Sequence, residues 1–146
     1  MRGKIRLVLC ICLVFLLISC GARSSGLKDG YYSAEAAEFD NHGWKEYVTI
    51  CVSGGRIILI EYNAFNPSGF IRSWDMDYMR AMDAIGGIYP NAYTRHYSRM
   101  FLEKQGVNGI DAITGASHSF PVFIKLAETV LQNAREGNRK TAFVRI

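Results

Sequence analysis

The sequence DAITGASHSF (residues 111–120) places a group of polar side chains directly before a long amphipathic pattern. It holds three hydroxyls, one carboxylate and one imidazole, those of Thr114, Ser117, Ser119, Asp111 and His118. Over residues 120–134, apolar side chains then recur every three or four positions, which is the spacing of an amphipathic helix. Gly137 is a natural C-terminal stop. The stretch therefore lies at the N-terminal end of a predicted helix.

The residues of this stretch allow three interpretations, of which the first two concern the N-terminus of the predicted helix. The N-terminus of a helix offers unpaired N–H groups and a partial positive charge, so it suits a phosphate. Gly115 and Ala116 would let a bulky anion approach the backbone, so the segment is a candidate for seating a phosphate or for carrying one on a hydroxyl. The simpler interpretation is helix capping, with Ser119 as N-cap and Pro121 in the first turn. Hydroxyl-rich caps are common, so spacing alone favours capping.

A serine nucleophile is a third interpretation, because residues 115–119 imitate the G-x-S-x-G motif of hydrolases. Ser119, however, stands where the second glycine belongs, and the motif needs a strand directly before it and a distant histidine. His118 is adjacent in sequence and poorly placed as a base, and the other histidines are His42 and His96. We therefore do not favour hydrolysis.

The N-terminus has the pattern of a lipoprotein signal peptide. A basic region with three positive side chains is followed by an apolar run over residues 7–18, which is shorter than the roughly 20 residues of a transmembrane helix. Ser19 and Cys20 follow at the expected cleavage site, so residues 1–19 are a predicted signal peptide and Cys20 a predicted lipidation site. Two or more acyl chains would hold the protein stably on a membrane. Residues 20–28 then form a lipid-anchored tether.

Removal of the signal peptide changes the charge and cysteine arguments. The chain has 17 basic and 13 acidic side chains, and loss of Arg2, Lys4 and Arg6 leaves 14 basic ones and a net charge of +1. No basic field remains to suggest nucleic acid. Of the four cysteines, only Cys51 would be both retained and unlipidated, which excludes an internal disulfide. We expect Cys51 to be a small buried residue, and we expect no metal site.

The mature chain reads as strands first and helices afterwards. The predicted strands are residues 29–36 and a hairpin of residues 46–53 and 56–65 around Gly54-Gly55, and the predicted helices are residues 75–85, 90–104 and 120–134. A row of Met76, Met79, Met82 and Ile85 is assigned to core packing. This order predicts one α+β domain, residues 29–137, with an antiparallel sheet and helices packed against it. Residues 138–146 are a predicted C-terminal tail.

The segment at residues 111–119 also resembles the D-x-x-[ST]-G-A-[ST]-x-[ST] signature of the FMN-binding domain family. That family includes flavin-carrying subunits of sodium-pumping NADH:quinone oxidoreductase and extracellular flavin lipoproteins. The resemblance extends, in the same order, to Asp29-Gly30-Tyr31, His42-Gly43-Trp44 and Gly54-Gly55-Arg56-Ile57. It covers roughly residues 28–137, nearly all of the mature chain.

The resemblance implies a modification site. In that family an exported FAD:protein FMN transferase attaches FMN by a phosphoester to the hydroxyl after Gly-Ala, which here is Ser117, although threonine is more frequent at this position. Asp111 would serve recognition or orient the acceptor, and Thr114 would help to shape the turn. The implied cofactor-binding residues are Ser117, Asp111, Thr114, Gly115, Ala116 and His118, with Trp44 and His42 as candidates beside the flavin ring. For Trp44, core packing is an equal alternative, and His42 fits a solvated loop.

The resemblance implies an exported, membrane-anchored flavoprotein that passes electrons, with no catalytic residue of its own. Its implied partners are the FMN transferase, a membrane oxidoreductase or quinol-linked electron donor, the membrane itself through the lipid anchor, and a terminal acceptor. No nucleic acid is expected. Two alternatives stay open: a reductase that binds FMN without a covalent bond, and a binding lipoprotein that has lost flavin.

Overall fold

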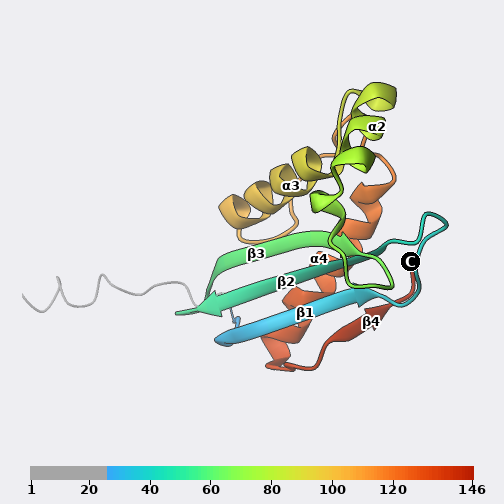
Figure 1. Cartoon of the computed structure of the whole chain (residues 1–146). Helices are drawn as coiled ribbons and strands as arrows, with labels where there is room; N and C mark the ends of the chain where they lie inside the picture. Colours follow the sequence, from blue (N-terminus) through green and yellow to red (C-terminus); the bar gives the residue numbers. More distant parts are fainter. Residues whose placement is uncertain (1–25) are drawn as a thin grey trace, which may run out of the picture.

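The computed structural model describes residues 26–146, so the predicted signal peptide and Cys20 lie outside the described residues. The elements are β1 (Gly30–Ala36), β2 (Lys45–Ser53), β3 (Arg56–Phe65), the 3-10 helix η1 (Arg72–Trp74), α2 (Met76–Gly86), α3 (Pro90–Lys104), α4 (Ser119–Glu136) and β4 (Ala142–Val144). They form one α+β domain with a four-stranded sheet in the order β3-β2-β1-β4. Figure 1 shows α4 behind the sheet and α3 above β3. The predicted fold class is confirmed.

Strands β2 and β3 form a hairpin around a two-residue turn. Gly54 and Gly55 have φ angles of 58° and 70°, and two residues of positive φ give the turn that joins Ser53 to Arg56. The turn is tied to the start of β1, because the Asp29 carboxylate accepts the N–H groups of Gly54 and Gly55 at 3.0 Å each. The hairpin prediction is confirmed.

The strand β4 corrects the predicted tail, since residues 142–144 pair with β1. The pairing is parallel, with Ala34 opposite Ala142, whereas β1–β2 and β2–β3 are antiparallel. The sheet is therefore mixed, although mostly antiparallel. Three residues are too few for a period-two pattern to appear in sequence. The strand forms because α4 crosses behind the sheet and returns the chain to the free edge of β1.

The core lies between the sheet and the two long helices. The inward side chains of β2 include Val48 and Ile50, both fully buried. Aromatic rings fill the space between β3, α3 and α4: the rings of Tyr97 and Phe123 stack with centroids 5.1 Å apart, and Tyr62 lies 4.9 Å from Phe123. The predicted core stripe of α4 is confirmed, and α4 ends at Gly137 with φ 75° as expected.

The predicted core row of the methionine helix is only partly correct. Helix α2 begins after the N-cap Asp75 and ends at Gly87, close to the predicted bounds. Met79 is buried, but Met76 and Ile85 are 58% and 86% exposed. The reason is position: α2 packs against η1 and α3 and does not cover the sheet, so a single residue of the row reaches the core. None of the described helices has the length and apolar character needed to cross a membrane.

Candidate functional site

The segment of residues 111–118, here called the acceptor loop, runs over the surface into α4. It is fixed to the core at two points. The hydroxyl of Tyr97 on α3 accepts the N–H of Ile113 at 3.0 Å, and the side chain of Ala116 is 4% exposed. Between them Gly115 adopts φ 83°, a left-handed conformation in which a side chain would be strained. A fixed backbone with one buried methyl group leaves the neighbouring side chains on the outside.

Ser117 lies in this outward-facing part of the loop. Its side chain is exposed, and within residues 26–146 its hydroxyl has no hydrogen-bond partner. Asp111, Thr114 and His118 are also exposed, so the structure places these predicted site residues on one surface loop. An exposed hydroxyl without a partner is accessible to an enzyme that modifies it.

Ser119 does not cap α4, contrary to prediction. The N-cap position is His118, with helical angles of φ −73° and ψ −39° and no side-chain cap. Ser119 is the first helical residue, and its hydroxyl donates to Glu46 Oε1 at 3.3 Å. In the described part of the chain, the N–H groups of Ser117, His118 and Ser119 have no acceptor, whereas that of Phe120 bonds to Ala116 at 3.2 Å. The helix therefore presents free N–H groups, which is the arrangement that binds phosphates.

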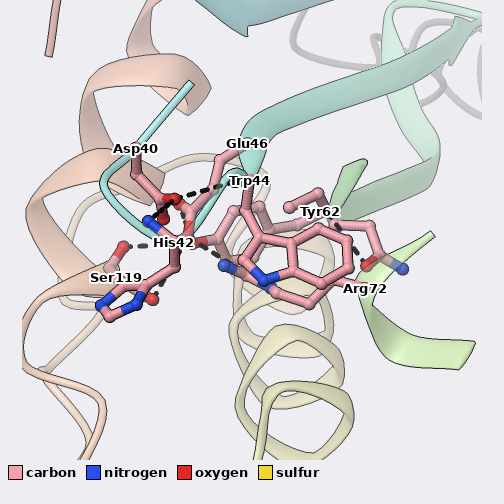
Figure 2. Close-up of polar contacts among 9 residues, drawn as sticks. Asp40, His42, Trp44, Glu46, Tyr62, Arg72 and Ser119 are labelled. Atoms are coloured by element: carbon pink, nitrogen blue, oxygen red, sulfur yellow. Dashed lines mark hydrogen bonds and ion pairs between the residues drawn. The ribbon is translucent and has the colours of Figure 1, made fainter. Parts of the chain in front are cut away.

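A buried polar cluster lies beneath this helix end, as Figure 2 shows. It consists of Glu46 on β2, Tyr62 on β3, Arg72 on η1 and Ser119 on α4. Arg72 Nη2 is 2.9 Å from Glu46 Oε1, and the Tyr62 hydroxyl donates to Glu46 Oε2 at 2.7 Å. The same hydroxyl lies 3.2 Å from the Ser119 carbonyl oxygen. The cluster joins four elements at the start of α4.

The charges of the cluster stabilise each other. Burial, the largest single effect, would lower the pKa of the Arg72 guanidinium, but the Glu46 carboxylate, together with Tyr93 and Tyr62, raises it overall, so Arg72 stays charged. Burial, followed by the charge of Glu46, raises the pKa of Tyr62 well above its ordinary value, so Tyr62 stays protonated and donates. All of these groups are buried or partly buried, so the cluster is suited to holding the helix end in place.

Sequence reasoning missed this cluster. A signal existed for Glu46, because it occupies an inward position in alternation with Val48 and Ile50, where a charge needs a buried partner. No such signal existed for Arg72, which lies in a 3-10 helix of only three residues. Proximity of these two residues depends on the path of the chain after β3.

Trp44 and His42 lie in the loop before β2. The Asp40 carboxylate accepts the N–H groups of both residues at 2.8 Å, which fixes the loop (Figure 2). Trp44 is 7% exposed, and its ring lies 5.7 Å from that of Tyr78 on α2. His42 is exposed. The packing of Trp44 supports its core role, while His42 is the accessible side chain of this loop.

Two further predictions from the sequence concern the burial of Cys51 and metal-binding side chains. Cys51 is 8% exposed and unpaired, as expected of a small core residue. Over residues 26–146, no group of three or more histidine, cysteine, aspartate or glutamate side chains is arranged to hold a metal ion.

Three known proteins are similar to this chain, while no family model matches it. It is 33% identical over 144 residues to the 15 kDa lipoprotein of Treponema pallidum (strain Nichols), which covers 99% of this chain and 98% of the relative. The crystal structure of the CPE2226 protein from Clostridium perfringens has a TM-score of 0.78 and 41% identity, covering 82% of this chain and 98% of that chain. A solution NMR structure of a Clostridium thermocellum protein has a TM-score of 0.52 and 27% identity, covering 74% and 92%.

Proposed function

Because the chain belongs to the family of the 15 kDa lipoprotein of Treponema pallidum, we propose that it is likewise an exported lipoprotein, anchored through Cys20. We further propose that its folded domain carries FMN as a phosphoester on Ser117 and passes electrons at the membrane surface. The two parts are independent. The first rests on the relative and the signal-peptide pattern, and the second on the acceptor loop.

One observation carries the flavin proposal: the unpaired, exposed hydroxyl of Ser117 lies next to the free N–H groups that begin α4. A phosphate joined to Ser117 Oγ would lie at the positive end of the helix, where N–H donors stabilise its charge. The residues present therefore fit a phosphoester. Neither a general base nor a metal site is needed on this chain, because a transferase would supply the chemistry.

The attachment step balances without a further reactant. The Ser117 oxygen forms a bond to the FMN phosphorus of FAD, the pyrophosphate bond breaks, and AMP leaves while the transferase accepts the hydroxyl proton. The fixed backbone of the acceptor loop holds Ser117 outward for this step. The cluster of Glu46, Arg72, Tyr62 and Ser119 keeps the first turn of α4 in place beneath it.

A covalent bond suits an exported carrier. A non-covalent cofactor that dissociates outside the cell is lost, whereas a tethered one keeps a high local concentration. Attached FMN would supply electron transfer, and the chain's own residues would hold and expose it. The proposed partners are the FMN transferase, a membrane oxidoreductase or quinol-linked donor, and a terminal acceptor.

The test is the intact mass of protein purified from the native envelope, combined with flavin fluorescence in a denaturing gel. The expected result is a mass increase of one FMN in wild type and none in Ser117→Ala. Ser53→Ala, which removes an exposed hydroxyl at the end of β2, should retain the full increase. Fluorescence that persists in Ser117→Ala would place the bond elsewhere.

Two other outcomes reject the covalent proposal. An unmodified Ser117 in cells that contain the transferase, together with a flavin absorption spectrum, would establish non-covalent binding. If neither the mass increase nor the flavin absorption spectrum is observed, the protein is a lipoprotein without flavin. The anchor is tested separately: Cys20→Ala should move the protein from the detergent-rich phase to the aqueous phase, and an unchanged distribution would reject lipidation.

A further inference from the structure

A cavity of about 430 Å³ lies between the edge strand β3, the 3-10 helix η1 and the first half of α3. Its volume is within the range of roughly 300–1,000 Å³ found for small-molecule sites. The residues of its wall that determine its chemistry are Tyr47, Glu61, Asn63, Trp74, Arg95 and Ser98. This surface, here called the β3–α3 cavity, is not part of the acceptor loop.

The cavity and the acceptor loop contact different residues of α3. Asn91, Arg95 and Ser98 recur at helical spacing and line the cavity. Tyr97 belongs to a different side of the helix, where its hydroxyl holds Ile113 of the acceptor loop at 3.0 Å. A ligand in the cavity is therefore distinct from a group attached to Ser117.

The cavity holds one carboxylate and one guanidinium that are not paired with each other. Glu61 Oε1 accepts a hydrogen bond from Asn63 Nδ2 at 3.0 Å, and Asn63 is only 5% exposed. Asn63 also donates to Ser73 Oγ at 2.8 Å, which fixes the amide that orients Glu61. Arg95 has no hydrogen-bond or ion-pair partner in the part of the chain that the structure describes. Two opposite charges thus remain open to a ligand.

Aromatic side chains form the apolar part of the wall. Trp74 is 67% exposed, although it is among the largest side chains of the protein, and its ring lies edge-on to that of Phe70 with centroids 6.4 Å apart. Tyr47 is half-buried, and burial, followed by the negative charge of Glu61, raises its pKa to about 12. Its hydroxyl therefore stays protonated at neutral pH and is available as a donor beside Glu61.

We propose that the β3–α3 cavity binds a free zwitterionic α-amino acid with an aromatic or large apolar side chain. The ligand carboxylate pairs with Arg95, its ammonium group pairs with Glu61, and its side chain packs against Trp74 and Tyr47. A zwitterion pairs with both charges at once, whereas a singly charged ligand leaves one of them without an ion-pair partner. This binding function is additional to the proposed flavin and does not depend on it.

The experiment is isothermal titration calorimetry of the full-length, detergent-solubilised protein with L-phenylalanine. Two probes each lack one charge: phenylalanine amide has no carboxylate, and 3-phenylpropionate has no ammonium group. We expect saturable binding of L-phenylalanine and at least about tenfold weaker binding of each probe, because each loses one ion pair. Arg95→Ala and Glu61→Gln should each weaken L-phenylalanine binding by about tenfold or more.

Arg99→Ala is the matched control, since Arg99 is exposed one turn further along α3 and lies 4.0 Å from Glu103. It should bind L-phenylalanine as wild type does. Trp74→Phe should keep part of the affinity, because a ring remains. The intact mass of the same variants reports flavin attachment at Ser117, so failure of one proposal is distinguishable from failure of the other.

Three results would overturn the amino-acid proposal. The first is no saturable heat up to about 10 mM L-phenylalanine, which corresponds to less than about 3 kcal/mol of binding free energy. The second is equal affinity in wild type, Arg95→Ala and Glu61→Gln. The third is saturable binding of riboflavin that competes with L-phenylalanine and is unaffected by both substitutions, which would assign the cavity to a flavin ring.

Discussion

Glu46 and Arg72 form an ion pair inside the protein, with Arg72 Nη2 2.9 Å from Glu46 Oε1 and side chains 10% and 4% exposed. The same carboxylate accepts hydrogen bonds from the hydroxyl groups of Tyr62 and Ser119. One acidic group therefore fixes η1 and the start of α4 to the sheet. Because the pair is shielded from water, loss of one partner leaves an uncompensated charge.

Arg72→Met is expected to lower the free energy of unfolding by about 3–5 kcal/mol, because Glu46 loses its buried cation. Urea denaturation followed by circular dichroism measures the change. The double variant Glu46→Gln/Arg72→Met should recover part of the loss, since no buried charge remains. A single variant within about 1 kcal/mol of wild type would show that water reaches Glu46.

Gln105 closes the outer edge of β3. Its side-chain amide accepts the N–H of Ile57 at 2.8 Å and donates to the Ile57 carbonyl at 2.9 Å, in the manner of a neighbouring strand. Gln105→Ala should cost about 1–3 kcal/mol through the lost hydrogen bonds, as measured by urea denaturation. Since Gln105 has φ 56°, Gln105→Gly should be less destabilising than Gln105→Ala, by about 0.4–1 kcal/mol. The reverse order would show that side-chain contacts outweigh backbone strain here.

Asp29 should make the hairpin sensitive to acid. The N–H groups of Gly55 and Gly54 lower the pKa of its carboxyl below 3.8, so its contribution to stability is fully present above 3.8 and is lost as pH falls through the lower folded value. At neutral pH, Asp29→Asn should melt a few degrees below wild type, and the difference should shrink below pH 3.8. Calorimetry across this range is the measurement. A constant difference at every pH would mean that the carboxylate charge is irrelevant.

Tyr47 should contribute to alkaline unfolding. Burial and Glu61 raise its pKa to about 12 in the folded protein, whereas an unfolded tyrosine ionises near 10.0. Its contribution is therefore fully present below pH 10.0 and is lost as pH rises through about 12. Tyr47→Phe should lose less stability over this interval than wild type does. Ultraviolet titration of tyrosinate in both folded proteins measures the pKa of Tyr47. A pKa near 10.0 for Tyr47 in the folded protein would contradict the prediction.

The structure confirms the elements that were predicted from turn residues and apolar periodicity. Two adjacent glycines with positive φ define the β2–β3 turn, and an apolar stripe between a polar start and Gly137 defines α4. The burial of Cys51 also follows from its place in a β-branched strand. These features depend on neighbours within a few positions, so local sequence is sufficient to predict them.

Features that depend on distant partners were missed or misassigned. Ser119 was predicted as an N-cap, but Glu46, 73 positions away, draws its hydroxyl inward. Residues 142–144 were predicted as a tail, but β1 offers them an unpaired edge. Met76 and Ile85 were predicted as core residues, but α2 lies beyond the sheet. In each case the competing partner belongs to another element.

The sequence by itself determined the first three strands, the three α-helices, the hairpin, and the placement of Ser117 just before α4, because these follow from turn residues and apolar periodicity. Only the tertiary structure decided that the Ser117 hydroxyl is exposed, that Glu46 and Arg72 form an ion pair at the start of α4, and that Glu61 and Arg95 share a cavity. The physical reason is that burial and charge pairing are properties of packed elements. The partner of a buried side chain depends on how the sheet and helices pack together, and the local spacing of residues does not predict that packing.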